Sequence, residues 1–258
     1  MRPVTDVRGF RRELHVEIAE HRVTGELVDD FHHFRAEFDV TPGHVVAARG
    51  AALRYPWGTC PGAIGGLAEF LGPVEGGSAR AVATRTTRLR HCTHLRDVAA
   101  LSLARWARGG ASTVYSIFVA DPVTGPTHAS IARDGHGLVE WQIEGLCIRS
   151  PELWAGCSLG RGAAFAERLA PELGDEQIEA ILLLQRSCLI ALGRQYDLDT
   201  CRHATDVPGA PTGACFTYGR TVAPEATRVP GATLDFAADA DLRALSRAWV
   251  ARHGPARG

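Results

Sequence analysis

The clearest alternation of apolar and polar residues runs from Phe31 to Val40 and predicts a β-strand. Successive side chains of a strand point to opposite faces, so every second residue belongs to the same face. The even positions are mostly apolar and the odd positions mostly charged, which predicts one buried side and one solvent-facing side. His32 is therefore expected to point into the apolar side, and its neighbour His33 is expected to point outward.

Turn residues separate strand-like runs at two places and predict two β-hairpins. Thr41-Pro42-Gly43-His44 joins the first strand to a returning strand over residues 45–55. Asp134-Gly135 lies between residues 128–133 and 138–148, both of which have strand-like composition. The remaining predicted strands cover residues 13–19 and 113–120.

Helical spacing of apolar residues is strongest over residues 93–107, where little polar face remains, so a buried helix is predicted. Pro61 favours the first turn of another helix, which Gly72-Pro73 ends. Residues 74–88 are rich in Gly, Ala, Thr and Arg and predict a loop. Two further amphipathic helices are predicted over residues 175–192 and 238–253.

These elements predict an α+β fold in which antiparallel hairpins pack with several helices as one compact domain. The sequence contains no repeat and no clean linker. The main domain is expected over residues 21–236. An N-terminal extension over residues 1–20 would precede it, and a C-terminal helix and tail over residues 237–258 would follow it.

Length and net charge limit the classes of protein to which the chain can belong. The chain has 258 residues, which suffices to bury a real core, and its formal net charge of −1 favours neither nucleic acid nor an anionic membrane as a partner. The first residues lack the apolar core of a signal peptide, and no apolar run approaches the length of a membrane span. Seven cysteines lack the spacing of a disulfide framework. We therefore expect reduced thiols, a cytoplasmic location and a small-molecule partner, and a homodimer is compatible with this.

The absence of lysine limits the chemistry that the chain can perform. Every basic side chain other than histidine is arginine. This excludes a lysine Schiff base, a pyridoxal-phosphate anchor, a phosphate-loop lysine and a kinase-type lysine. Histidine, carboxylates, thiols, tyrosine and arginine remain for any reaction, and no organic cofactor is expected.

Two runs gather groups suited to chemistry, and each puts a cysteine at the start of a predicted helix. The positive end of a helix lowers a thiol pKa. One interpretation is a zinc or iron site in an accessory or scaffold protein. Others are a cysteine nucleophile with a histidine base, or thiols that line a pocket while a histidine moves protons. The plain alternative is that both thiols are small core residues. The runs are Pro56-Trp57-Gly58-Thr59-Cys60-Pro61 and His91-Cys92-Thr93-His94, and the metal set would be Cys60, Cys92, His91 and His94.

His32 is the leading candidate for a general base. A histidine on an apolar face, two residues from Asp30, would be oriented by that carboxylate. A core histidine bonded to a backbone carbonyl is the alternative, and Asp29 and Asp30 are more often turn residues than catalysts.

Other residues would bind the substrate or simply build the fold. Arg88, in an arginine-rich run, would hold an anionic group or face solvent. Tyr55, Trp57 and Trp141 would wall an apolar pocket or fill the core. Residues 156–160 match Gly-x-Ser-x-Gly in form, but no buried strand precedes them, so a hydrolase remains a weak alternative.

The order of these motifs resembles a bacterial family known only as a domain of unknown function. The likeness covers roughly residues 20 to 236 and leaves the termini outside. It implies no established chemistry, but members of the family look like companions of catabolic or biosynthetic enzymes, which implies a small-molecule role. The matching residues are Asp30, His33, Phe34, Pro56, Trp57, Cys60, Pro61, Cys92, Thr93, His94, Leu95, Arg133-Asp134-Gly135, Ala155-Gly156, Ser158-Leu159 and Cys215-Phe216-Thr217-Tyr218.

The sequence thus predicts an enzyme that uses acid–base chemistry on a largely apolar metabolite, as an isomerase, cyclase, lyase or hydratase. The alternatives are the metal-binding accessory protein described above and a ligand-binding protein without chemistry. The expected catalytic residues are His32, His33, Asp30, His94 and Cys92, and the expected substrate-binding residues are Trp57, Cys60, Tyr55, Arg88 and Trp141.

Overall fold

The computed structural model describes residues 8–74, 77–122, 125–161, 164, 173–238 and 240–254. The chain divides into two compact units, whereas the sequence predicted one domain. No helix in the described ranges is long and apolar enough to cross a membrane. The larger unit comprises Leu14–Thr113, Asp197–Leu234 and Asp241–Gly258, and the smaller unit comprises Met1–Glu13, Val114–Tyr196 and Asp235–Ala240.

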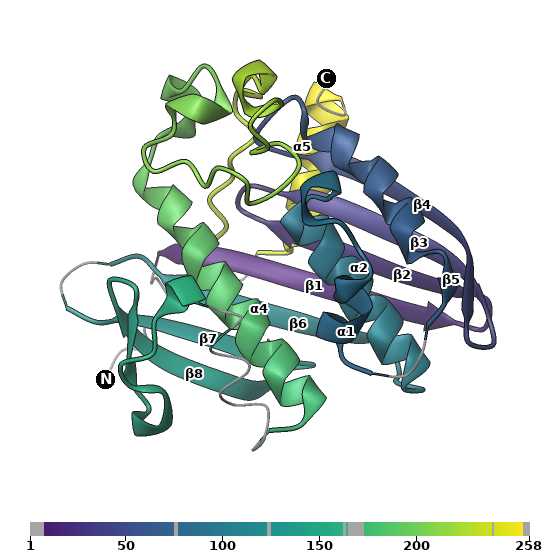
Figure 1. Cartoon of the computed structure of the whole chain (residues 1–258). Coiled ribbons are helices and arrows are strands. Elements are labelled where there is room, and N and C mark those ends of the chain that lie inside the picture. The colour runs from purple at the N-terminus through teal and green to yellow at the C-terminus, as the bar shows by residue number, and fades with distance from the viewer. Residues whose placement is uncertain are drawn as a thin grey trace. The chain divides into compact units, whose positions relative to one another are not determined.

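Strands in the order β5-β4-β3-β2-β1 form the framework of the larger unit (Figure 1). The pairs β2–β3, β3–β4 and β4–β5 are antiparallel. The first predicted hairpin is confirmed, because Thr41 pairs with His44 across the turn between β3 and β4. The strand bounds are β1 Gly9–Ala19, of which this unit holds the part from Leu14, β2 Arg22–Asp29, β3 His33–Thr41, β4 His44–Arg54 and β5 Gly72–Pro73.

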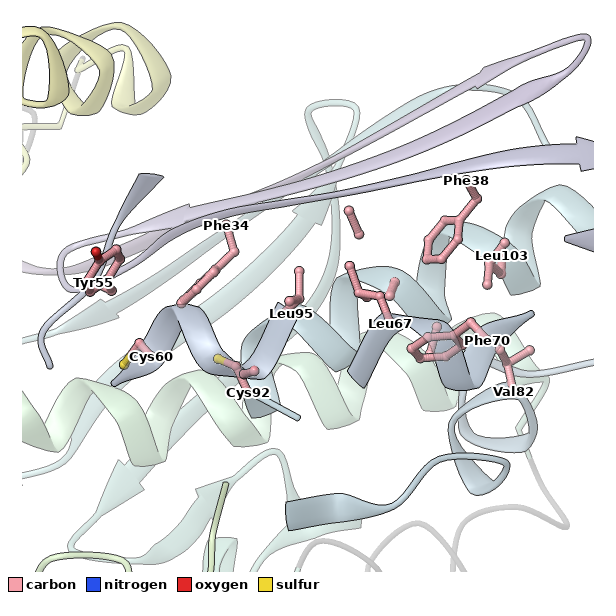
Figure 2. Packing of buried hydrophobic residues seen from close by; sticks show 14 of the residues in the cluster. Phe34, Phe38, Tyr55, Cys60, Leu67, Phe70, Val82, Cys92, Leu95 and Leu103 are labelled. Carbon is pink, nitrogen blue, oxygen red and sulfur yellow. The ribbon is translucent and has the colours of Figure 1, made fainter. Parts of the chain in front are cut away.

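Helix α2 (Thr93–Ala107) lies against β2 and β3, and the 3-10 helix η1 (Cys60–Phe70) lies against β4. Side chains from these elements meet in one buried apolar cluster, which Figure 2 shows from close by. Helix α5 (Leu242–His253) contacts β2 and β4. The cluster includes Phe34 and Phe38 from β3, Leu67 and Phe70 from η1, and Leu95 and Leu103 from α2. The other helical segments of this unit are α1 Ala79–Thr84, η2 Arg88–Arg90, η6 Leu198–Thr200, η7 Ala204–Asp206 and η8 Ala223–Glu225.

Strand β2 was not predicted, because nearly all of its residues are buried, including the polar Thr24 and Glu26. Burial on both faces removes the period-two contrast that identifies a strand. Gly25 allows α2 to approach closely, since a Cβ there would lie 2.4 Å from Ser102 Oγ and 2.9 Å from the Val98 carbonyl oxygen.

The smaller unit has the strand order β1-β6-β7-β8-β9, with helix α4 against β7 and β8 (Figure 1). The second predicted hairpin is confirmed, because Arg133 pairs with His136. Asp134 and Gly135 have φ of 50° and 79°, as the tight turn requires. The bounds are β6 Thr113–Ala120, β7 Thr127–Arg133, β8 His136–Glu144, β9 Cys147–Ser150, α4 Asp175–Ala191, η3 Glu152–Trp154, η4 Leu159–Arg161 and η5 Leu192–Gln195.

The coarse prediction of antiparallel strands with helices is confirmed, and three local predictions change. The helix that begins near Pro61 is a 3-10 helix. The predicted loop over residues 74–88 contains α1, whose N-cap Ser78 accepts a hydrogen bond from the Ala81 N–H. The predicted strand over residues 138–148 is two strands, because Gly145 turns the chain with a φ of 57°.

Gly66 in η1 is expected to tolerate no larger residue. A Cβ there would lie 2.5 Å from the Arg90 carbonyl oxygen and 2.9 Å from the His91 ring. Gly66→Ala should therefore lower the free energy of unfolding by about 1–3 kcal/mol. Gly65 has nothing within 4 Å of such a Cβ, so Gly65→Ala is the matched control and should stay within about 1 kcal/mol of wild type. Urea denaturation measures both, and equal losses would contradict the packing argument.

Candidate functional site

The turn between β2 and β3 presents an oriented histidine. Oδ1 of Asp29 accepts hydrogen bonds from the backbone N–H groups of Phe31 and His32, both at 2.8 Å. The same oxygen lies 3.0 Å from Nδ1 of His32. Because a carboxylate only accepts, Nδ1 of His32 carries the proton in this contact, and Nε2 keeps the basic lone pair. One carboxylate therefore shapes the turn and selects the tautomer of His32.

His94 joins this pair from the first turn of α2. Its ring stacks on that of His32, with ring centroids 3.9 Å apart and an interplanar angle of 27°. Nδ1 of His94 lies 3.5 Å from the sulfur of Cys92, the N-cap residue of α2. Asp29, His32, His94 and Cys92 are thus linked within the larger unit by two polar contacts and the stack of the two rings. His32 and His94 are buried, with 8% and 7% of each residue exposed.

Asp29, His32 and His94 are the residues that could hold a metal ion. One ligand atom from each lies within 4.8 Å of the others, and all three side chains are buried. The predicted set of Cys60, Cys92, His91 and His94 makes no such group among the described residues. His91 turns away instead, with Nε2 at 3.0 Å from the Glu69 carboxylate.

Arg54 supports the turn between β2 and β3, and the sequence did not predict this role. Its guanidinium is fully buried and donates to the carbonyl oxygens of Asp30 at 2.8 Å, Ala232 at 2.6 Å and His32 at 3.2 Å, and also to that of Asp29. Burial lowers the pKa of Arg54 to about 10, so it remains charged at neutral pH. The register explains its position, because Arg54 pairs with His33 at the end of the β3–β4 ladder.

The carboxylate that contacts His32 is that of Asp29, not the predicted Asp30. The Asp30 carbonyl oxygen accepts from Arg54 and from the Leu234 N–H. The expectation that Asp29 is a turn residue is also correct, since the turn and the histidine contact share one oxygen atom. The spacing of three residues between Asp29 and His32 gave no guidance, because Asp30 and His33 have the same spacing.

The prediction that His33 points to solvent is wrong. The side chain is fully buried, because α5 contacts β2 and β4 at this end of the sheet. Its Nε2 lies 2.6 Å from Glu26 Oε1, and its Nδ1 lies 2.9 Å from Ser246 Oγ. Arg54 Nε donates to the same hydroxyl at 2.9 Å. Because the Glu26 carboxylate only accepts, His33 Nε2 carries a proton, and in the neutral ring that burial favours, Nδ1 accepts from the Ser246 hydroxyl. His33 is then neutral and donates from Nε2 to Glu26, which makes it part of a sealed structural network.

The charges in that network agree with this assignment. Burial lowers the pKa of His33, which favours the neutral ring. Burial raises the pKa of Glu26, but the hydrogen bond from His33 and the charges of Arg243 and Arg247 outweigh it and hold the pKa at about 2. Arg243 and Arg247 reach the carboxylate from α5, at 2.7 Å and 3.1 Å.

Three thiols gather near His94, as the sequence predicted for two of them. The Phe216 N–H donates to the His91 carbonyl oxygen at 2.8 Å, and the Thr93 hydroxyl donates to the Ala214 carbonyl oxygen at 3.1 Å, which sets Cys215 opposite Cys92. The Thr217 hydroxyl lies 3.4 Å from the Cys60 sulfur. Figure 2 shows Cys60 and Cys92 at the starts of η1 and α2.

The expected net lowering of these thiol pKa values at the helix starts is wrong, because burial outweighs the backbone N–H groups that favour the thiolate. Burial raises the pKa of Cys60 to about 12 and that of Cys92 well above its ordinary value. The neighbouring thiols add to the rise for Cys92. Both groups are therefore protonated at neutral pH, and neither has the properties of an activated nucleophile.

The predicted substrate-binding residues are in several places. Burial and the nearby Cys60 raise the pKa of Tyr55, which places it beside the thiols. Trp57 is buried under the Arg228 guanidinium, 5.8 Å from its ring centre. Arg88 is exposed and donates to the Ala214 carbonyl oxygen at 3.3 Å. Trp141 belongs to the smaller unit, where its ring packs on that of Trp154 with centroids 5.6 Å apart.

Comparison with protein-family models, with curated proteins and with solved structures found no match for this chain. The family resemblance stated above remains a prediction. A functional proposal therefore rests on the geometry of the larger unit.

Proposed function

We propose that the chain is an enzyme that moves protons on a small, largely apolar metabolite without an organic cofactor. The contact between Asp29 and His32 is the observation that carries the proposal. A carboxylate that fixes the imidazole tautomer and stabilises the imidazolium is the arrangement that a histidine general base needs. Nε2 of His32 would accept the proton, and an isomerase, cyclase, lyase or hydratase reaction would follow.

The surroundings of His32 support an apolar substrate. The rings of Phe31 and Phe34 lie beside it, with centroids 6.2 Å and 5.9 Å from that of the imidazole. His94 is stacked on the same ring and would return the proton or polarise the substrate, with Cys92 orienting it. The family resemblance implies a small-molecule role as well.

Replacing His32 with glutamine should abolish turnover while leaving the fold intact. Loss of a general base typically lowers kcat by about 10²–10⁴-fold. The substrate would be found by incubating the purified protein with a metabolite extract and following masses that disappear and form. The matched control is His128→Gln, since His128 also contacts a carboxylate, Glu140 at 2.7 Å, but lies in the smaller unit.

The outcomes separate the candidate functions. Turnover that survives in His32→Gln would refute the proposed base. Saturable binding of a metabolite that leaves unchanged in mass and structure would instead indicate a binding protein without chemistry. Equal losses in His32→Gln and His128→Gln would indicate a nonspecific effect on folding, which circular dichroism detects.

A further inference from the structure

Three side chains from two elements bring a carboxylate and two imidazoles to one place. Asp29 ends β2, His32 follows in the turn, and His94 lies in the first turn of α2. Their ligand atoms lie within 4.8 Å of one another, and each side chain is buried. We propose that Asp29, His32 and His94 bind one divalent first-row transition-metal ion such as Zn²⁺ or Fe²⁺.

The donor set matches the preference of these ions. Zinc takes imidazole nitrogen and carboxylate oxygen at about 2.0–2.2 Å, and a site of two histidines and one carboxylate is also typical of non-haem iron. Two ligands at that distance from one ion lie roughly 3–3.5 Å apart. Asp29 Oδ1 and His32 Nδ1 are already 3.0 Å apart, and an ion bound by Nδ1 would displace the proton of their hydrogen bond. The centroids of the two imidazole rings are 3.9 Å apart. Because nitrogen lone pairs lie in the ring planes, the His94 ring must turn out of its stack on His32 to direct a nitrogen at the same ion.

The groups behind the ligands keep them in place before an ion arrives. Two backbone N–H groups fix the Asp29 carboxylate, and Arg54 binds the carbonyl oxygens of the turn. Cys92 contacts Nδ1 of His94 at 3.5 Å and orients its ring. Outer contacts of this kind set the orientation of metal ligands and add to affinity. The site therefore loses little conformational entropy on binding.

The other buried histidine–carboxylate pairs lack this capacity. Both ring nitrogens of His33 are hydrogen-bonded, to Glu26 and to Ser246. His91 has Glu69 as its carboxylate, and the pair makes no group of three possible ligands among the described residues. The cluster at Asp29 thus differs from both in donor number.

The inference rests on the same cluster as the proposed function and deepens it by naming an ion. Three protein ligands leave coordination positions open, as in catalytic rather than structural metal sites. An ion held there would lower the pKa of a water molecule that it binds, and that water, with His32 as a ligand, would supply the base in place of the imidazole. The proton transfer proposed above is otherwise unchanged.

The test uses the full chain without a histidine tag, stripped with a chelator and dialysed. Calorimetry with Zn²⁺ and visible spectroscopy with Co²⁺ should both show about one saturable site per chain. Asp29→Asn, His32→Gln and His94→Gln should each weaken binding by at least about 100-fold, since outer-contact losses alone cost about 10–100-fold. Asp29→Asn keeps an oxygen that can accept the Phe31 and His32 N–H groups, so its turn should survive.

His128→Gln is again the matched control and should bind the ion as wild type does. No saturable binding, or binding unchanged in Asp29→Asn and His94→Gln, would overturn the proposal. The two proposals fail separately. A protein that shows no saturable metal binding but turns over its metabolite through His32 refutes the metal site alone, whereas a protein that binds the ion but shows no turnover refutes the enzyme alone.

Discussion

Replacing Arg54 with methionine is expected to destabilise the protein by about 3 kcal/mol or more, because several buried oxygen atoms lose the hydrogen-bond donor that Arg54 supplies. The carbonyl oxygens of Asp30 and His32 have second donors, the Leu234 N–H and the Asp29 N–H, each at 2.8 Å. The carbonyl oxygens of Asp29 and Ala232 lose the Arg54 donor, as does Ser246 Oγ. Each buried acceptor left without a donor costs about 1–3 kcal/mol. Urea denaturation measures the loss.

Arg49→Met is the matched control, because Arg49 is on the same strand, β4, and is partly exposed. Its guanidinium bonds to Asp39 at 2.7 Å on the surface, and such pairs contribute about 0–1 kcal/mol. The Arg54 variant should also lose the ordered His32 turn, which is observable as a changed imidazole resonance in NMR spectra. A destabilisation no larger than that of Arg49→Met would show that Arg54 does not support the turn.

Acidification should remove about 3 kcal/mol of stability through Glu26 alone. Its pKa is about 2 in the folded protein, against an ordinary value of 4.5. Because the folded value is the lower one, the contribution is fully present above pH 4.5 and is lost as the pH falls toward 2. The difference of about 2.5 pH units corresponds to roughly 3 kcal/mol at 1.36 kcal/mol for each unit. The groups that face Glu26 are the neutral His33 on β3 and the charged Arg243 and Arg247 on α5.

Glu26→Gln tests this assignment at two pH values. The variant should be about 3 kcal/mol less stable than wild type at pH 7, and the difference should vanish near pH 2, where wild type has lost the same charge. Glu37→Gln is the control, since the Glu37 side chain pairs with Arg35 at 2.6 Å while 24% exposed. It should change stability by no more than about 1 kcal/mol. A Glu26→Gln effect that is equal at both pH values would mean that the carboxylate charge is not the cause.

The local pattern of residues in the sequence was sufficient to predict many of the strands and helices. Residues 93–107 and 113–120 form the predicted helix and strand with the predicted bounds, because each has a strong periodicity or composition of its own. Turn chemistry likewise predicted the β3–β4 and β7–β8 hairpins. Strand β2 escaped prediction because its polar residues are buried, so alternation along the chain carried no signal.

The candidate site was predicted only in part. The sequence identified His32, His94 and Cys92 as neighbours, and the structure brings them together through the stacking of two rings. The sequence could not identify Arg54, because nothing in the local pattern distinguishes it from any other polar residue at the end of a strand. It also assigned His33 to solvent, because the helix that covers it begins at Leu242, more than two hundred residues later in the chain.

The sequence by itself determined where many of the strands, turns and helices form, that no lysine chemistry operates, and which histidines and thiols are available. These properties depend on neighbours within a few residues, so periodicity and turn chemistry report them. Only the tertiary structure decided that Asp29 rather than Asp30 orients His32, that His33 is sealed beneath α5, and that the thiols stay protonated. Burial and hydrogen-bond partners come from segments distant in sequence, and they set the ionisation and orientation of every group in the site.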